Sequence, residues 1–346
     1  LSGPADSYAG FDVRAAGDIN GDGFADLVIG AYGDDANGTD SGSAFVVFGK
    51  AGGFAADLNL AGLNGSTGFR INGAAGDDAG LSVSGAGDIN GDGFDDLMVG
   101  ALFADPNGNH SGSTFVVFGK ASGFTASINS SSLTGLSGFV IDGAAVDDRA
   151  GRSVSNAGDV NGDGFDDMLI GAVGADPNGS DSGATYVVFG TSASFGAGID
   201  LSTLDQDVSK GFAIEGGAAS DFSSIAVSAA GDVNGDGYDD ILIGARGADV
   251  NGNESGSTYL LFGKASGFDA HINLDTLTGA TGLRLNGVAA YDFSGIAVAG
   301  AGDARVLFEA VGCDSQPGAL GHRDLGQQAA PAVAGNRGLG CGAAQG

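Results

Sequence analysis

The sequence contains few cysteines, few basic residues and no long apolar run, and each shortage excludes a class of protein. Its two cysteines, Cys313 and Cys341, lie in the last part of the chain, so residues 1–303 hold no disulfide framework. No stretch of about 18 apolar residues is present, so the sequence predicts no membrane span. Only 13 Lys and Arg oppose 43 Asp and Glu. The net charge of −30 argues against binding nucleic acid or an anionic membrane surface, because both carry phosphate groups.

Histidine is also scarce, which limits the enzymatic possibilities. His110, His271 and His322 are the only three, and they occupy unrelated places in the sequence. No catalytic triad can be assigned to them. The chain is therefore predicted not to be an enzyme.

Glycine, by contrast, is abundant, at 68 of 346 residues, and it recurs at fixed positions within a repeat. The segment GDINGDGFADLVIGA, which begins at Gly17, returns in closely similar form at Gly87, Gly158 and Gly231. The step is about 71 residues, and self-similarity at a fixed period indicates an array of one structural unit. With 42% hydrophobic residues the array can bury a core, so wholesale disorder is excluded.

Each unit contains four short segments with the pattern of β-strands, as the second unit illustrates. Residues 81–87 and 138–143 alternate in hydrophobicity, whereas 96–101 and 114–119 are continuous apolar runs. Long helical periodicity is absent, and only a short helical turn is expected, within 126–136. Four antiparallel strands repeated radially form the blades of a β-propeller. A solenoid is the alternative, but its repeats are usually shorter, at about 20–45 residues.

Two dipeptides in each unit carry a resemblance to a known family. With its Gly-Ala and Phe-Gly pairs, the unit resembles the FG-GAP repeat of the integrin alpha-subunit propeller and its bacterial relatives, over about residues 1–303. The resemblance implies an all-β fold, a β-propeller built from four-stranded FG-GAP blades of about 71 residues each. The proline that usually follows Gly-Ala in the family is absent here. The pairs are Gly30–Ala31, Gly100–Ala101, Gly171–Ala172 and Gly244–Ala245, with Phe48–Gly49, Phe118–Gly119, Phe189–Gly190 and Phe262–Gly263.

The repeat region, residues 1–303, is expected to be part of a longer ring. Integrin-like propellers usually have seven blades, whereas this region supplies four full blades and the first strand of a fifth, over 294–303, and begins midway through a unit. We therefore expect an incomplete ring, with further repeats missing from this chain; a closed five-bladed ring is the alternative. At Asp303 the repeat stops within its motif. Residues 304–346 form an atypical tail, interpreted as a shifted reading frame or a disordered low-complexity linker.

Acidic residues are concentrated in the motif D-x-N-x-D-G-x-x-D, which joins the first strand of each unit to the second. Side chains at positions 1, 3, 5 and 9 and the backbone carbonyl at position 7 offer hard oxygen ligands at a spacing that suits Ca²⁺. The glycine at position 6 permits the sharp reversal. Softer metals would require His or Cys, and Mg²⁺ prefers to keep its waters. The sequence predicts about four calcium ions, one per complete motif. The predicted ligands are Asp18, Asn20, Asp22, Phe24 and Asp26; Asp88, Asn90, Asp92, Phe94 and Asp96; Asp159, Asn161, Asp163, Phe165 and Asp167; Asp232, Asn234, Asp236, Tyr238 and Asp240.

An alternative interpretation of the motif is that Asn-Gly and Asp-Gly simply form good hairpin turns. It explains the glycines but not the aspartates at positions 1, 5 and 9 of all four copies. Two carboxylates about 4 Å apart repel by roughly 1–4 kcal/mol, so three in one loop would spread the hairpin without a cation. We therefore expect calcium to have a structural role, with its binding adding to the free energy of folding.

Other polar loops are expected at the opposite ends of the strands. In a four-stranded meander, the turn from the second to the third strand and the connection to the next unit lie away from the calcium loops. In the integrin relatives, this face meets ligands and partner subunits, so we expect an unknown protein or glycan ligand here. The alternative is a solvated rim of turn-forming residues. The segments are 32–43, 102–113, 173–184 and 246–257, with Asp77, Asp78, Asp147, Asp148, Asp221 and Asp292 in the connections.

Together these features predict a calcium-binding β-propeller module of a secreted or cell-surface protein, with a role in adhesion or ligand recognition. Two alternatives stay open. The first is a structural scaffold attached to a catalytic domain elsewhere. The second is a polysaccharide-acting enzyme, since some polysaccharide lyases carry this type of repeat.

Overall fold

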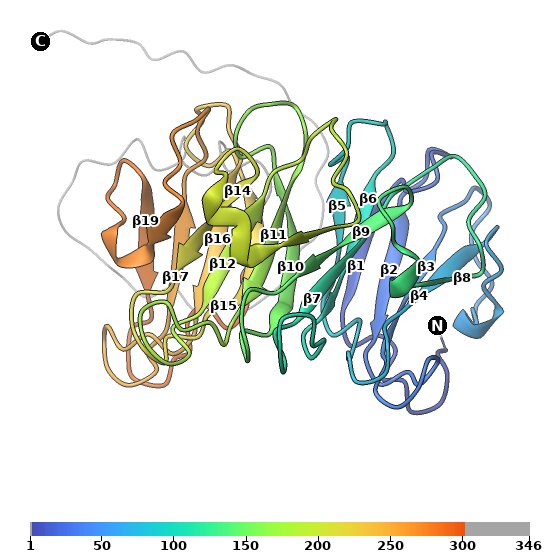
Figure 1. Cartoon of the computed structure of the whole chain (residues 1–346), viewed down its shortest axis with the longest axis horizontal. Coiled ribbons are helices and arrows are strands. Elements are labelled where there is room, and N and C mark those ends of the chain that lie inside the picture. Colours follow the sequence, from blue (N-terminus) through green and yellow to red (C-terminus); the bar gives the residue numbers. More distant parts are fainter. Residues whose placement is uncertain (1, 302–346) are drawn as a thin grey trace, which may run out of the picture. The chain divides into compact units, whose positions relative to one another are not determined.

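The computed structural model describes residues 2–301, which form four β-sheets (Figure 1). The predictions made for residues 304–346 lie outside this part of the chain. The all-β prediction is confirmed, because the helical elements among the described residues are short 3-10 turns. None of them has the length and apolar character needed to cross a membrane. These turns are η1 (Leu60–Gly62), η2 (Ser130–Ser132), η3 (Leu201–Gln206) and η4 (Leu274–Thr276).

Each sheet is built on four antiparallel strands that we call a blade. In blade 2 the predicted segments appear as β5 (Val83–Gly87), β6 (Asp96–Ala101), β7 (Ser113–Val117) and β9 (Gly138–Asp142). Their ends agree with the sequence prediction to within about two residues. The other strands are β1 (Val13–Gly17), β2 (Asp26–Ala31), β3 (Ser43–Val47) and β4 (Gly68–Asn72) in blade 1; β10 (Ala150–Gly158), β11 (Asp167–Ala172), β12 (Ala184–Val188) and β14 (Gly211–Glu215) in blade 3; and β15 (Ser223–Gly231), β16 (Asp240–Ala245), β17 (Ser257–Leu261) and β19 (Gly282–Asn286) in blade 4.

A fifth, parallel strand completes the outer edge of blades 1 to 3, and it comes from the blade that follows. β8 (Ser127–Asn129) leaves blade 2 and pairs with β4 of blade 1. In the same way β13 (Gly198–Asp200) pairs with β9, and β18 (His271–Asn273) pairs with β14. The sequence analysis did not predict these strands, although the helical turn expected within 126–136 is present as η2, directly after β8. The prediction of four strands per sheet therefore needs correction at this edge.

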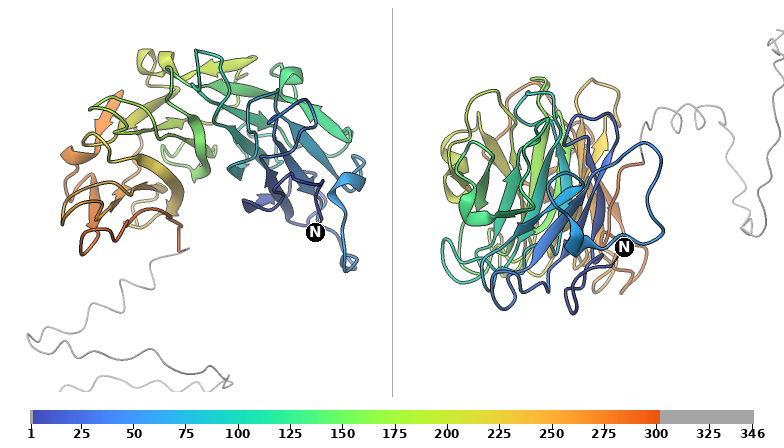
Figure 2. Two further views of the ribbon diagram at one scale, coloured as in Figure 1. Left: turned by 90° about the horizontal axis from the view of Figure 1, so that it is seen from below. Right: turned by 90° about the vertical axis from the view of Figure 1, so that its right-hand side faces the viewer.

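The first strands of successive blades lie side by side along the inside of an open arc (Figure 2). β1 contacts β5, β5 contacts β10, and β10 contacts β15. The described residues form four blades and do not close into a ring, which confirms the predicted incomplete propeller. The strand expected over 294–303 appears, up to residue 301, only as an isolated bridge between Ser294 and Gly256. No second strand of a fifth blade is present among the described residues to pair with it.

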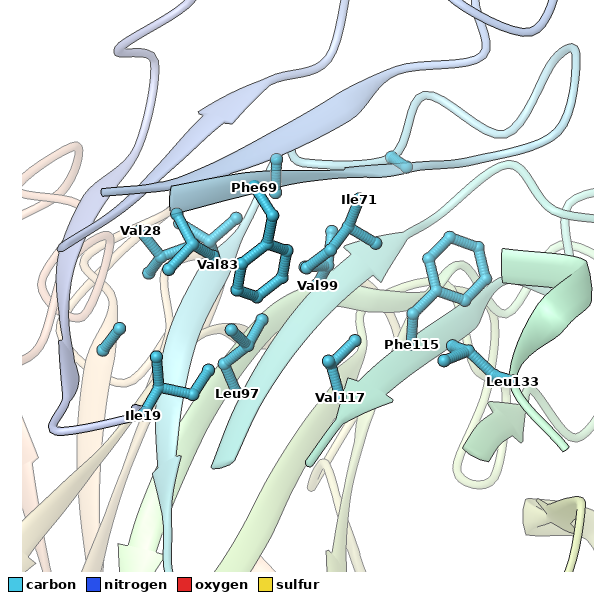
Figure 3. Packing of buried hydrophobic residues seen from close by; sticks show 14 of the residues in the cluster. Ile19, Val28, Phe69, Ile71, Val83, Leu97, Val99, Phe115, Val117 and Leu133 are labelled. Carbon is cyan, nitrogen blue, oxygen red and sulfur yellow. The ribbon is translucent and has the colours of Figure 1, made fainter. Parts of the chain in front are cut away.

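The strands are apolar on both faces because blades cover one another. β6 and β11 are buried along their whole length, as their continuous apolar sequences predicted. Apolar cores fill the spaces between successive blades, and Figure 3 shows the one between blades 1 and 2, where Phe69 packs near Leu97. Leu97 is 0% exposed, whereas the equivalent Leu27 of blade 1 is 40% exposed. Contact with the preceding blade therefore accounts for the burial of this position.

Each of these cores contains a trio of phenylalanines from two blades whose rings contact one another. In the first core, Phe48 of the Phe-Gly pair and Phe69 of β4 belong to blade 1, and Phe124 comes from the segment of blade 2 before β8. The rings of Phe69 and Phe124 are stacked, with centroids 4.7 Å apart. Phe124 thus helps to hold β8, the strand that blade 2 contributes to the sheet of blade 1, against that blade. The other trios are Phe118, Phe139 and Phe195, and Phe189, Phe212 and Phe268.

We expect Phe124→Ala to lower the free energy of unfolding by about 3–5 kcal/mol, because it empties a buried aromatic contact between two blades. Phe54 holds the equivalent position in blade 1, where its side chain is 51% exposed against 8% for Phe124. Phe54→Ala is the matched control and should change stability by less than about 0.5 kcal/mol. Urea unfolding followed by circular dichroism measures both variants. Equal losses would contradict the interblade packing described above.

Candidate metal centres

The D-x-N-x-D-G-x-x-D motif forms the hairpin between the first and second strands of every blade, as predicted. β1 ends at Gly17 and β2 begins at Asp26, and we call residues 18–26 acidic loop 1. The register of the strand pair shifts just before the loop, and Gly17 adopts a φ of 75°, in the left-handed region that favours glycine. Acidic loops 2, 3 and 4 are residues 88–96, 159–167 and 232–240.

Three side chains of each acidic loop turn inward and accept hydrogen bonds from the loop's own backbone. In loop 1 the two carboxylate oxygens of Asp18 accept from the N–H groups of Asp22 and Gly23, at 3.0 and 2.8 Å. The side-chain oxygen of Asn20 also accepts from Asp22 N–H, at 2.9 Å, and Asp22 accepts from Phe24 N–H, at 3.0 Å. Gly23 has a φ of 87°, in line with the reversal predicted at position 6. Loops 2 to 4 repeat these bonds, so positions 1, 3 and 5 surround one turn in every blade.

The aspartate at position 9 lies beneath the loop and is completely buried. In loop 2 the Asp96 carboxylate accepts hydrogen bonds from Ile89 N–H, at 3.2 Å, and from Gly119 N–H, at 2.8 Å. Gly119 belongs to the Phe-Gly pair, and a side chain there would come within 2.4 Å of the Asp95 carbonyl oxygen. Asp96 therefore ties the acidic loop to the turn after β7. The equivalent aspartates of the other loops are also buried and accept hydrogen bonds from the same two kinds of partner. They are Asp26, Asp167 and Asp240.

Burial places these carboxylates in an unfavourable electrostatic environment. Desolvation raises the pKa of Asp26 to about 6 and the pKa of Asp96 and of Asp167 to about 8, although the two backbone hydrogen bonds oppose the shift. The other aspartates of the same loop raise the pKa further. The ion pairs formed within residues 2–301 include none of the position-9 aspartates. A buried carboxylate without a cationic partner is costly, so the site suits a bound cation.

The predicted ligands do not stand together as a complete coordination shell. Within the described residues, no three His, Cys, Asp or Glu side chains are grouped so that they could hold a metal ion. The oxygens of position 9 are turned towards backbone amides, and those of positions 1 and 5 accept hydrogen bonds within the loop. The donors nevertheless fit a hard cation chemically, because all of them are oxygens and most are carboxylates. The ligand sets therefore stay a prediction.

At the opposite ends of the strands, polar side chains are engaged in closing turns. The side-chain amide of Asn37 donates to the Gly73 carbonyl, at 2.9 Å, which links the 32–43 loop to the connection that leads to blade 2. Within that connection, Asp77 accepts from Ala74 N–H, at 2.7 Å. These aspartates thus have a structural role that the sequence analysis, which placed them on a recognition face, did not identify. The same contacts recur at Asn107, Asn178 and Asn251, and at Asp148, Asp221 and Asp292.

Comparison with family models places every acidic loop inside a known repeat. Four segments match the model of the FG-GAP repeat, at residues 15–47, 79–117, 150–188 and 225–261. The chain belongs to the FG-GAP repeat family. Each match ends with the third strand of one blade, so it covers the first three strands of that blade and the acidic loop between the first two.

Curated relatives of this FG-GAP protein carry the names of integrin alpha subunits. Integrin alpha-5 of Xenopus laevis is 30% identical over 258 residues, which cover 71% of this chain and 20% of the relative. Integrin alpha-PS5 of Drosophila melanogaster is 35% identical over 169 residues, or 49% of this chain and 15% of the relative. Integrin alpha-7 of Mus musculus is 31% identical over 160 residues, or 46% and 12%. The chain thus matches a fifth or less of these relatives, whose names agree with a non-enzymatic, integrin-like propeller.

We expect Asp96→Ala to lower the free energy of unfolding by about 2–4 kcal/mol even in the presence of EGTA, because it leaves two buried N–H groups without an acceptor. Asp92→Ala removes an exposed carboxylate from the same loop and should cost less than about 1 kcal/mol under the same conditions. Denaturant unfolding in EGTA separates this structural effect from any loss of metal binding. Two variants of equal stability in EGTA would show that the role assigned to position 9 is wrong.

Proposed function

We propose that this FG-GAP chain is a calcium-binding β-propeller module that recognises a protein or glycan ligand outside the cell or at its surface. The observation that carries the proposal is that, in all four blades, an aspartate lies buried beneath a loop of further oxygen donors and forms no ion pair with the described residues. The integrin names of the relatives support the comparison with a recognition module.

The predicted ligands of each loop would hold the ion through oxygen alone. In loop 2, Asp88, Asn90 and Asp92 would contribute side-chain oxygens, Phe94 its backbone carbonyl, and Asp96 its buried carboxylate. When bound, calcium supplies two positive charges that offset a repulsion of roughly 1–4 kcal/mol per close carboxylate pair. The loaded loop would hold together two strands and the Phe-Gly turn, so we propose a structural role for about four ions, one per loop.

A calcium requirement of this kind supports an extracellular location. Calcium sites of extracellular modules have dissociation constants of about 10⁻⁴–10⁻³ M, far weaker than those of cytosolic calcium buffers. Such sites are filled only where calcium is plentiful. A propeller that depends on them for stability would be suited to a secreted or cell-surface protein.

The ligand face is proposed to be the end of the arc opposite the acidic loops. Long loops at this end, such as 32–43 and 102–113, are held by rigid strands, an arrangement that suits recognition. The net charge of −30 favours a ligand that carries basic groups over one that carries phosphate or sulfate.

A second candidate function is a structural scaffold beside a catalytic domain of a longer protein. The observation that favours it is that Asp77, Asp148 and Asp221 close their own turns, so the acidity of this face does not require a ligand. Arrays of glycans and matrix proteins, probed in calcium, separate the two functions. Specific binding supports recognition, and its absence across the arrays supports the scaffold.

We expect thermal unfolding to occur several degrees higher in millimolar calcium than in EGTA, because an ion at about ten times its dissociation constant stabilises a protein by about 1.4 kcal/mol per site. Magnesium should give a smaller shift. The double variant Asp88→Asn with Asp92→Asn should reduce the calcium stoichiometry in calorimetric titration by about one ion. Identical unfolding midpoints in calcium, magnesium and EGTA, without heat of calcium binding, would overturn the proposal.

A further inference from the structure

Successive acidic loops are in direct contact through the aspartate at position 8 of the motif. In loop 2 this residue is Asp95, and its Oδ2 accepts a hydrogen bond from the backbone N–H of Asp18, the first predicted ligand residue of loop 1, at 2.6 Å. Every such contact runs from position 8 of one blade to position 1 of the blade before. It recurs between Asp166 and Asp88 and between Asp239 and Asp159, both at 2.9 Å.

Further contacts join the same pairs of loops. Lys120, which follows the Phe-Gly pair of blade 2, donates its backbone N–H to the Ile19 carbonyl in loop 1, at 2.9 Å. The ring of Phe94, at position 7, lies over Gly21, where an added Cβ would come within 2.4 Å of the ring. The acidic loop of one blade is thus enclosed by the loop of the next. Phe165 covers loop 2 and Tyr238 covers loop 3 in the same way.

We infer that Asp95, Asp166 and Asp239 are positioning residues that couple metal binding in each acidic loop to metal binding in the loop of the following blade. The inference rests on the proposed function, since it requires that the acidic loops bind calcium. Each of these aspartates lies between two predicted ligands of its own loop, at positions 7 and 9. An ion held by that loop therefore restrains the aspartate between them.

The restrained aspartate acts on the loop before it. Asp166, for example, fixes the backbone of Asp88, whose side chain is the first predicted ligand of loop 2. Asp166 N–H also donates to the Asp88 carbonyl, at 3.4 Å, so the two residues are joined in both directions. Binding in loop 3 therefore favours binding in loop 2, and thermodynamic reciprocity requires the converse.

The carboxylate at position 8 points to a bound cation, because it adds negative charge to a region that is already acidic. The Asp95 oxygen lies against the backbone of Asp18, whose own carboxylate is the first predicted ligand of loop 1, so like-charge repulsion between these two side chains opposes this placement. The opposition falls when a cation is held between them. A hydrogen bond that accepts with a full negative charge is also about twice as strong as a neutral one. The first effect ties the contact to the loaded state of the loops, and the second makes the contact strong.

The two ends of the arc provide an internal comparison. Position 8 of loop 1 is Ala25, so blade 1 lacks the aspartate. In loop 4, an added Cβ at Gly235 meets nothing within 4 Å in the described part of the chain, whereas the equivalent Gly162 of loop 3 is covered by the Tyr238 ring.

Terbium(III) luminescence tests the coupling in the full chain, with Tb³⁺ as the probe. Tyr238 is the only tyrosine at position 7; its ring lies over loop 3 and its carbonyl is a predicted ligand of loop 4. It should sensitise Tb³⁺ in both loops, and Tyr238→Phe should remove that signal.

Two variants of Asp239 test the contact between loops 3 and 4. Asp239→Ala removes the contact to loop 3, and Asp239→Asn keeps an acceptor oxygen. Asp57→Ala removes the charge of an exposed aspartate and serves as the control.

With loop 3 intact, we expect Asp239→Ala to raise the half-saturating Tb³⁺ concentration by about tenfold, because the charge-assisted hydrogen bond is lost. Asp239→Asn should raise it less, because the amide oxygen still accepts the bond without the charge. When loop 3 is disabled by Asp159→Asn with Asp163→Asn, adding Asp239→Ala should change the remaining titration by less than about twofold. An equal loss in both backgrounds would overturn the coupling, because a structural defect of blade 4 would weaken loop 4 as well. No loss in the intact background would also overturn it.

The coupling and the proposed function fail in different ways. If the unmodified chain binds neither Tb³⁺ nor Ca²⁺, the proposed function is wrong, and the coupling falls with it. If the chain binds both ions with the same affinity whether residue 239 is Asp or Ala, only the coupling is wrong.

Discussion

A buried aspartate joins the two halves of every repeat, and the rest of the fold depends on it. One oxygen of Asp96 holds the acidic loop through Ile89, and the other holds the Phe-Gly turn through Gly119. These bonds hold a buried carboxylate between the acidic loop and the Phe-Gly turn. Burial raises the pKa of the Asp96 carboxyl. The acidic loop above it, the proposed cation and the enclosure by the next blade can all be understood as responses to that one buried charge.

Features that repeat within a unit could be predicted from the sequence. The apolar run 96–101 corresponds residue for residue to β6, because a short run bounded by aspartate and glycine is a local signal that needs no knowledge of neighbours. The position of the acidic loops between the first and second strands is local in the same sense. Their ligand chemistry could be proposed from spacing alone, since carboxylates and glycines at fixed offsets specify both the turn and its donors.

Contacts between units could not be predicted, because each joins residues far apart in the sequence. β8 is only three residues long and has no periodicity, so nothing in its sequence marks it as a strand of the preceding sheet. Asp95 resembled one more acidic residue beside Asp96, and its partner Asp18 is 77 residues away. The second partner of Asp96 lies 23 residues later, and the only signal for it was a glycine that leaves no room for a side chain.

Because each blade supplies a short strand to the sheet of the blade before it, the order of synthesis affects how such a chain folds. A ribosome that makes the blades in order leaves a single uncovered sheet edge at any moment, and the next stretch of chain closes it. In the described residues that edge belongs to β19, whose sheet has four strands where the others have five. Uncovered edges are templates for pairing between molecules. Refolding from denaturant exposes every edge at once, so these proteins should aggregate more readily when renatured than when translated.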